Sequence, residues 1–527
     1  MKRAFLTVAG RQLHYRWGGN GAPIVMLHPS PLSSAALLPL AAELAKGFRV
    51  YALDTPGYGQ SESLPFPPQS LDDYLPTFAA ALDALGLGRV CLYGAATGAQ
   101  FAIEFSRRYP ERVALMVIDS AGHIDADECE RIVRDYFPDV SPRQDGSHLA
   151  TLWQMVRDLF VFFPWCDRRA ATRIDRDLPP PAVMQGMLHD YLRAGSDYSR
   201  AYRPAFYNER AERAQQVRVP AVLTRWQGSI VLRITDALIA AGLPANYHVL
   251  ELGPSAAERF EGIRAYLQRH YRAAAAPAVP ASALPNGRLG SVLLDIDGMQ
   301  LHARRATGQG RARPSLRLHS SASSAAFVEM ISVRGSVSTE ASDLILLDLP
   351  GNGESGAPPD PAGLSIEKRA RYALAALNAL GIDQVDVAGR YGGGSVALEM
   401  ARQAPERIAS VTLVGRSAYS EAERTALLAT YTPSFTPELD GTHLLRAWYW
   451  VRDQSLWSPH TRKLRANIIA GAPQLDLEHM QQKLVDVIGM GERYALAYAA
   501  EFNYPLDAVQ RTLGCPVQSV DHWQAVR

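Results

Sequence analysis

The sequence lacks the features that would place it at a membrane or on a nucleic acid. Its 54 Lys and Arg residues are balanced by 53 Asp and Glu residues, and a net charge of +1 attracts neither nucleic acid nor anionic lipid. No run of about 18 apolar residues is present. The N-terminal segment is interrupted at Gly10, too early for a signal peptide. We therefore expect a cytoplasmic protein with no membrane and no nucleic-acid partner.

Cysteine is also scarce, and its placement excludes further classes of protein. The four residues (Cys91, Cys129, Cys166 and Cys515) have neither metal-binding nor redox spacing. A reducing compartment, no metal site and no cofactor are the simplest expectations. With 47% hydrophobic and 20% charged residues, the 527-residue chain can fill large cores, and nothing in its composition indicates disorder.

What the chain does contain is an internal repeat. Residues 54–61 (DTPGYGQS) recur as residues 348–355 (DLPGNGES), an offset of 294 (348 − 54). The glycine-rich turn at residues 94–98 (GAATG) recurs at residues 389–393 (GRYGG), an offset of 295 (389 − 94). A nearly constant offset over so many matches indicates a tandem duplication. Further matched pairs are Pro110–Pro405, Asp145–Asp440, His148–His443, Trp153–Trp448, Arg157–Arg452, Asp158–Asp453, Tyr198–Tyr494, Tyr202–Tyr498 and Phe206–Phe502.

A Pro/Ala-rich stretch separates the two copies. Residues 273–287 (AAAAPAVPASALPNG) have no apolar periodicity and are typical of a semi-extended linker. The sequence therefore predicts a first domain at residues 1–272 and a second at residues 288–527.

Each copy alternates short apolar runs with helical patterns. In the first copy, apolar runs at residues 24–27, 50–53, 90–93 and 114–118 are interleaved with helical patterns such as residues 71–85. This order predicts an α/β fold with a mostly parallel sheet built from βαβ units. About 100 residues of aromatic-rich helical pattern follow the strand near residue 118, and the second copy has the same insertion. We expect these insertions, at about 121–215 and 416–510, to form helical caps over the sheets.

Both halves resemble the α/β-hydrolase fold superfamily. The resemblance rests on the repeated Asp-x-Pro-Gly-x-Gly-x-Ser turn, the glycine-rich strand-to-helix elbow and the Pro-Glu-Arg-Val/Ile segment before the next strand. It covers nearly the whole chain outside the linker. It implies a nucleophile at the elbow, a histidine after the last strand and an acid after the seventh strand. It also implies a second copy that lacks its C-terminal strand and helix.

The elbow positions hold no standard nucleophile. Ala96 has no heteroatom, and the neighbouring Thr97 points in another direction on such a turn. Tyr391 carries a phenol, which is either a weak nucleophile or a large side chain that fills a vacated pocket. No serine stands at either tip.

The histidine and the acid are missing from their expected places as well. Residues 253–256 (GPSA), where the first copy needs its histidine, contain none, and residues 224–229 contain no carboxylate. Asp119 is an alternative acid or a turn cap, and Asp521 lies near the acid position of the second copy without a partner histidine. We therefore expect degenerate catalytic triads in both copies.

Several residues kept by both copies are candidates for ligand binding. His148 and His443 begin the cap helices that contain Trp153 and Trp448, and each histidine either binds a ligand or caps its helix. His28 and His319 begin the turns that in the resembling family supply an oxyanion N–H, but Pro29 has no N–H to donate. Aromatic residues at Trp165, Tyr191, Tyr198, Tyr202 and Phe206 are predicted to line an apolar roof.

These observations favour a pseudoenzyme. The predicted function is the binding of a small apolar ligand or carbonyl compound in a capped pocket, or of a protein partner. Self-association at the edge of the incomplete second sheet is a further possibility. The alternative is a hydrolase for esters or related carbonyl compounds that uses non-standard residues or a histidine from another chain.

Overall fold

The computed structural model describes residues 1–308, 313–332, 343–415, 417–523 and 526. These residues form two compact units: unit 1 comprises residues 1–141 and 151–283, and unit 2 comprises residues 142–150 and 284–527. Residue 416, where the second cap is predicted to begin, and residue 527, where the second domain is predicted to end, lie outside the described residues.

Unit 1 is built on an eight-stranded sheet in the order β1-β2-β4-β3-β5-β6-β7-β8. The β1–β2 and β2–β4 pairs are antiparallel, and all other neighbours run parallel. Buried parallel strands are nearly continuous apolar runs because helices cover both of their faces. The strands are β1 (Lys2–Val8), β2 (Arg11–Gly18), β3 (Pro23–Leu27), β4 (Arg49–Leu53), β5 (Val90–Ala95), β6 (Val113–Asp119), β7 (Ala221–Trp226) and β8 (Tyr247–Leu252).

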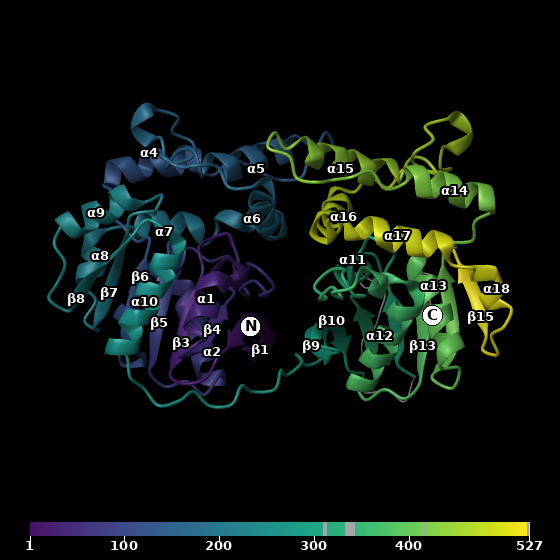
Figure 1. Cartoon of the computed structure of the whole chain (residues 1–527), viewed down its shortest axis with the longest axis horizontal. Helices are drawn as coiled ribbons and strands as arrows, with labels where there is room; N and C mark the ends of the chain where they lie inside the picture. The colour runs from purple at the N-terminus through teal and green to yellow at the C-terminus, as the bar shows by residue number, and fades with distance from the viewer. Residues whose placement is uncertain (309–312, 333–342, 416, 524–525, 527) are drawn as a thin grey trace. The chain divides into compact units, whose positions relative to one another are not determined.

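Helices cover both faces of this sheet, as Figure 1 shows. Helices α1 (Leu38–Leu44) and α10 (Ala256–His270) share one core cluster with the strands. Helices α2 (Leu75–Ala84) and α3 (Thr97–Arg108) contribute to the other, which α9 (Leu232–Ala240) joins through Leu238.

Unit 2 repeats this plan with a seven-stranded sheet in the order β15-β14-β13-β11-β12-β10-β9. The order equals that of the first seven strands of unit 1, and β15 is an edge strand among the described residues. The elements are β9 (Gly290–Ile296), β10 (Met299–Ala306), β11 (Ser315–Leu318), α11 (Ala325–Ser332), β12 (Leu344–Leu347), α12 (Ile366–Ala379), β13 (Val385–Arg390), α13 (Gly392–Gln403), β14 (Ile408–Val414) and β15 (Val517–Val520).

A set of helices follows the sixth strand of each sheet and forms the predicted cap. In the first copy these are α4 (Ala126–Tyr136), α5 (Ser147–Asp158), α6 (Pro181–Ala194), α7 (Tyr202–Asn208) and α8 (Ala211–Gln215). In the second copy they are α14 (Glu421–Thr430), α15 (Thr442–Asp453), α16 (Leu477–Met490), α17 (Arg493–Asn503) and α18 (Leu506–Gln510). The two sheets and their helices confirm the predicted α/β fold.

The repeated Asp-x-Pro-Gly-x-Gly-x-Ser turn is held together by its aspartate. The carboxylate of Asp54 accepts hydrogen bonds from His14 Nδ1 at 2.7 Å and from the backbone amides of Ser34 and Gln60 at 2.6 and 2.9 Å. Although burial opposes ionisation, these donors hold the pKa of Asp54 below its usual range. In unit 2 the corresponding donors to Asp348 are His302 at 2.7 Å, Ala325 at 2.6 Å and Glu354 at 3.0 Å. The recurrence of the motif is therefore accounted for by the hydrogen bonds with which its aspartate stabilises the turn.

A buried ion pair joins α10 to the sheet of unit 1. Arg259 is 16% exposed, and its Nε donates to the fully buried carboxylate of Asp119 at 2.8 Å. Tyr93 and Thr224 donate to the same carboxylate at 2.7 and 2.8 Å. At the positions of Asp119, Tyr93 and Thr224, unit 2 has Val414, Ala388 and Val520, respectively. No helix equivalent to α10 is found among its described residues, so no arginine of such a helix takes the place of Arg259.

We predict that Asp119→Asn destabilises unit 1, because it leaves the guanidinium of Arg259 buried without its counter-ion. The expected cost is about 3–5 kcal/mol. Asp119→Val combined with Arg259→Met should cost clearly less, because no charge then remains buried. Hydrogen–deuterium exchange of peptides from β5 and β6 measures the effect. Equal losses in the two variants would contradict this account.

Candidate functional site

The strand-to-helix elbow has the same strained backbone in both units. Ala96 joins β5 to α3 with φ 50° and ψ −115°, and Tyr391 joins β13 to α13 with φ 47° and ψ −113°. A residue other than glycine in such a conformation costs about 1–3 kcal/mol. Both copies have therefore retained a strained turn that in other proteins presents a side chain to a ligand.

Glycines beside each tip allow the elbow to approach the sheet. A Cβ on Gly98 would lie 2.1 Å from the carbonyl oxygen of Leu27, and one on Gly393 would lie 2.4 Å from that of His319. No side chain fits at these distances. The glycine pattern seen in the sequence is thus a packing requirement of the turn.

Above the elbow of unit 2 lies a cavity of about 450 Å³. It lies between the tip residue Tyr391 and the cap helices α14, α16 and α17. Its volume is within the range of ligand pockets. Its charged lining residues include Arg390, Lys483 and Glu501. Its aromatic lining residues are Tyr391, Tyr419, Tyr431, Trp457, Tyr498 and Phe502.

Glu501 is the most unusual residue of this cavity because it is 2% exposed and lies beside the elbow. Ser321 and Ser417 each donate a hydrogen bond to its carboxyl at 2.6 Å. A Cβ on Gly392, the first residue of α13, would lie 2.7 Å from Glu501 Oε2. Burial raises the pKa of Glu501 above its usual value, and the hydroxyl donors only partly offset this effect. A carboxyl group thus packs against the first turn of the elbow helix.

Three basic side chains, Arg390, Arg462 and Lys483, and the imidazole of His460 also line the cavity. Burial, reinforced by the charge of Arg390, lowers the pKa of Lys483 to about 8, and its Nζ lies 5.6 Å from the ring centroid of Phe327. Burial also lowers the pKa of His460 to about 4. The ring of His460 packs 4.4 Å from that of Tyr431, centroid to centroid, and its buried Nδ1 has no hydrogen-bond partner among the described residues.

In unit 1 the cap is closely packed with aromatic residues. Tyr136 and Phe206 lie 4.7 Å apart between ring centroids, Tyr202 and Phe206 are stacked at 5.5 Å, and Trp165 Nε1 donates to the carbonyl of Tyr136 at 3.2 Å. Together with Tyr191 and Tyr198, the predicted roof residues are thus packed among aromatic side chains, and all but the half-buried Tyr202 are buried.

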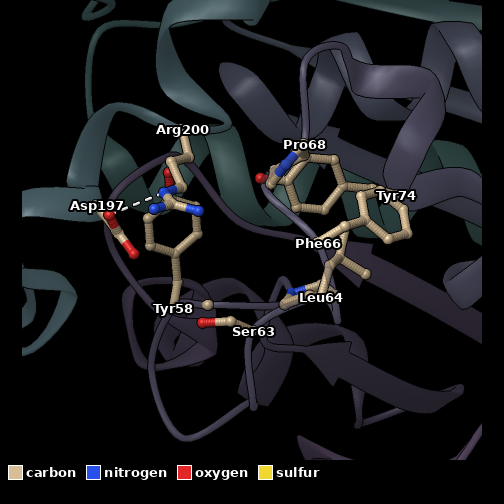
Figure 2. Close-up of a pocket in the computed structure, with 10 residues that line it drawn as sticks. Tyr58, Ser63, Leu64, Phe66, Pro68, Tyr74, Asp197 and Arg200 are labelled. Atoms are coloured by element: carbon tan, nitrogen blue, oxygen red, sulfur yellow. Dashed lines mark ion pairs between the residues drawn. The ribbon is translucent and has the colours of Figure 1, made fainter.

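Near the elbow of unit 1, the buried carboxyl group of Glu209 is bonded internally. Burial raises the pKa of Glu209 to about 8, and the amide of Gly122 donates to its carboxyl at 2.7 Å. A separate hollow of about 20 Å³, room for about one water molecule, lies beside the Asp54 turn. Figure 2 shows its lining, in which Arg200 pairs with Asp197 at 2.8 Å beside Tyr58.

The predicted ligand-binding histidines make hydrogen bonds to the chain itself. His28 and His319 donate from Nδ1 to the carbonyls of Pro29 and Ser320 at 2.9 and 2.7 Å. Their Nε2 atoms accept from the amides of Thr55 and Leu349, both at 2.9 Å. Nδ1 of His148 and of His443 accepts the amides of Arg143 and Glu438 at 3.2 and 3.1 Å.

The predicted tryptophans are buried as well. Trp153 is 3% exposed and Trp448 is fully buried. Within unit 2, Trp448 Nε1 donates to the carbonyl of Gln144 at 3.1 Å, and its ring lies 4.9 Å from that of His148. The residues lining the unit 2 cavity include none of these four histidines and two tryptophans.

The remaining candidates do not converge on one point. Thr97 is buried at the first position of α3, and its hydroxyl has no partner among the described residues. Asp119 is engaged by Arg259, and Asp521 is exposed after β15. Neither aspartate lines the unit 2 cavity.

Sequence analysis missed Glu501, Lys483 and His460. One signal was available for Glu501, because the register that matches Phe502 to Phe206 places Glu501 opposite Ala205. A charged residue then interrupts the buried stripe formed by Tyr494, Ala497, Tyr498 and Phe502. For Lys483 and His460 the sequence holds no comparable signal, because only the folded cap brings them to the elbow.

Comparison with known proteins agrees with this architecture. A family model described as the alpha/beta hydrolase fold matches residues 22–152 and 337–432, one segment in each copy. A haloalkane dehalogenase from Agrobacterium fabrum is 32% identical over 156 residues, 30% of this chain and 51% of the relative. A 2-hydroxy-6-oxononadienedioate/2-hydroxy-6-oxononatrienedioate hydrolase from Burkholderia vietnamiensis is 33% identical over 116 residues, 21% of this chain and 40% of the relative. The chain spans 36% to 51% of the length of the curated relatives it matches.

Among solved structures, an esterase from Thermogutta terrifontis aligns over 51% of this chain and 99% of its own, with 18% identity and a TM-score of 0.40. No helix in the described part of the chain is long and apolar enough to cross a membrane.

The family-model match in each half and the two sheets with one strand order show that this chain carries two α/β-hydrolase folds in tandem.

Proposed function

We propose that the chain is a small-molecule binding protein that uses the capped cavity of unit 2 and does not hydrolyse its ligand. The observation that supports this most directly is that a cavity of about 450 Å³ lies above an elbow whose tip residue is Tyr391. A phenol is a weak nucleophile without an adjacent general base. The site thus has the space for a ligand but lacks the group that would attack it.

The position of Glu501 argues further against hydrolysis. Acyl transfer needs backbone N–H donors at the elbow to stabilise a developing oxyanion. The carboxyl of Glu501 packs against the first turn of α13, where it takes up space that such an anion would need. His460, the imidazole of this cavity, packs against Tyr431, and no hydrogen bond joins it to Glu501 among the described residues.

The lining indicates the chemistry of the ligand. Tyr419, Tyr431 and Phe502 offer apolar faces, and Arg390 and Lys483 offer positive charge in the same cavity. An aromatic or aliphatic body with a carboxylate or carbonyl group satisfies both features. This ligand is more polar than the one expected from the aromatic residues of the cap alone.

Hydrolysis of an ester or related carbonyl compound is the second candidate function. The observation that favours it is that Tyr391, Glu501 and His460 line one cavity, so that a phenol, a carboxyl and an imidazole surround the same space. The names of the relatives, which include hydrolases and a dehalogenase, agree with this alternative. It requires the three groups to come together when a substrate binds.

The first prediction concerns ligand binding. Phenylacetate and longer aryl carboxylates should bind the full chain, as measured by isothermal titration calorimetry, and Lys483→Met should weaken binding by about 1.5–3 kcal/mol through loss of a charge-assisted bond. Because Lys483 loses its proton above its pKa of about 8, affinity should fall above that pH in the native chain and stay level in the variant. Arg390 and Asp486 are the charged groups that act on this lysine.

Lys463→Met is the matched control, because Lys463 pairs with Asp453 on the same cap and does not line the cavity. Its affinity should equal that of the native chain. Absence of binding for every carboxylate, or an equal loss in the two variants, would count against the proposal.

The second prediction concerns catalysis. The chain should hydrolyse a panel of nitrophenyl esters no faster than heat-denatured protein, and Ala96→Ser should restore little activity because residues 253–256, where a histidine would activate the serine, contain none. Turnover that disappears in Tyr391→Phe or Thr97→Val would instead establish the hydrolase. Absorbance of released nitrophenol measures the rate.

The third prediction concerns the pH dependence of stability. In the folded chain Glu501 keeps a proton that the unfolded chain releases near pH 4.3, so the folded state binds more protons above that pH. The free energy of unfolding should therefore fall by up to about 1.4 kcal/mol per pH unit as the pH rises from about 4.3 towards the raised pKa. Urea unfolding of Glu501→Gln should show a flatter dependence, and the exposed control Glu421→Gln should not. A slope unchanged in Glu501→Gln would refute this protonation state.

A further inference from the structure

A second hollow, of about 390 Å³, lies in the cap of unit 1, away from the elbow. Its lining includes four arginines, Arg157, Arg168, Arg173 and Arg176, and a single carboxylate, Asp158. We call it the arginine hollow. The excess of positive charge is local, because the whole chain carries a net charge of only +1.

The fold gathers these arginines from the end of α5 and the loop that follows it. Asp158 is only 5% exposed, and its carboxylate lies 3.8 Å from Arg157 and 3.5 Å from Arg168. The loop then returns along itself, with an antiparallel bridge between Phe162 and Arg173. The amide of Ile174 donates to the carbonyl of Val161 at 2.9 Å, which fixes the backbone of this return.

The second copy provides an internal comparison. Trp457 and Ile468 form the equivalent bridge, which sets the register between the two loops. In that register Lys463 replaces Arg168 and pairs with Asp453, Ile468 replaces Arg173, and Gly471 replaces Arg176. The loop therefore folds without the last two arginines, although in unit 1 the guanidinium of Arg173 also lies 5.7 Å from the ring centroid of Phe162.

Charge indicates what the arginine hollow accommodates. Four guanidinium groups around one carboxylate leave an excess of positive charge, which an anion with more than one charge would neutralise. Arginine forks match the oxygens of a phosphoryl group, with which they form paired charge-assisted hydrogen bonds. Phe160, Val161 and Leu178 supply an apolar wall beside the charges. A volume of about 390 Å³ suits a small organic molecule and exceeds what an inorganic ion fills.

We propose that the arginine hollow of unit 1 binds a phosphate ester of a small organic molecule. The phosphoryl group lies among Arg157, Arg168, Arg173 and Arg176, and the organic part lies against the apolar wall. This site is separate from the cavity of unit 2 and does not depend on the function proposed for it.

The test is calorimetric titration of the full chain with phenyl phosphate at low salt, and with benzyl alcohol as the uncharged probe. Phenyl phosphate should bind, more weakly as salt rises, and benzyl alcohol should not. Arg173→Ile combined with Arg176→Gly gives unit 1 the residues of unit 2, and it should weaken binding about tenfold or more.

A control variant removes two arginines that do not line the hollow. Arg169 pairs with Asp167 in the same loop, and Arg134 lies exposed on α4. Arg169→Ile with Arg134→Ala should leave the affinity within about twofold, and circular dichroism should show both double variants folded. The proposal is wrong if the native chain does not bind phenyl phosphate, or if the two double variants lose affinity equally.

Discussion

The close approach of each elbow to the end of the neighbouring strand is the constraint on which the rest of the structure depends. Gly98 and Gly393 lie so near the carbonyls of Leu27 and His319 that no Cβ fits. This contact forces Ala96 and Tyr391 into a left-handed backbone and aims the elbow helix at the space beneath the cap. The geometry belongs to the backbone, and it persists although the side chains at the two tips differ completely.

The two copies have kept one scaffold and changed the groups buried in it. Unit 1 has the Asp119–Arg259 ion pair, and unit 2 has Val414 where the carboxylate would stand. The replacement of the carboxylate by Val414 fits the absence of the arginine, because a buried carboxylate without a cationic partner would destabilise the fold. In the opposite direction, unit 2 has Glu501 where unit 1 has Ala205, and three hydroxyl groups, those of Ser321, Ser417 and Tyr419, surround it. Each buried carboxyl group is accompanied by the hydrogen-bond donors it needs.

The caps differ more than the sheets do. In unit 1, Tyr136, Phe206 and their aromatic neighbours are packed against one another. In unit 2 the corresponding helices border a cavity in which Arg390, Lys483 and Glu501 are found. Duplication allows such a division, because one copy can keep a ligand space while the other acquires different surfaces, among them the arginine hollow. The fold is common to both, and what each copy binds is decided by a few side chains.

The sequence by itself determined the duplication, the α/β fold and the identity of the elbow residues. Those properties follow from local patterns: apolar runs of strand length, glycines at a sharp turn, and a motif whose aspartate binds nearby amides. The cavity of unit 2 and its charged lining were decided only by tertiary structure. Arg390 belongs to the repeated elbow turn, but Lys483 and Glu501 come from the cap, far along the chain, and neither belongs to a repeated motif. The arginine hollow was also decided only by tertiary structure. Arg157 and Arg176 form no basic run in the sequence, and they line one hollow because the loop returns along itself. Burial and proximity, which set the charge of a buried carboxyl or lysine, exist only once the chain has folded.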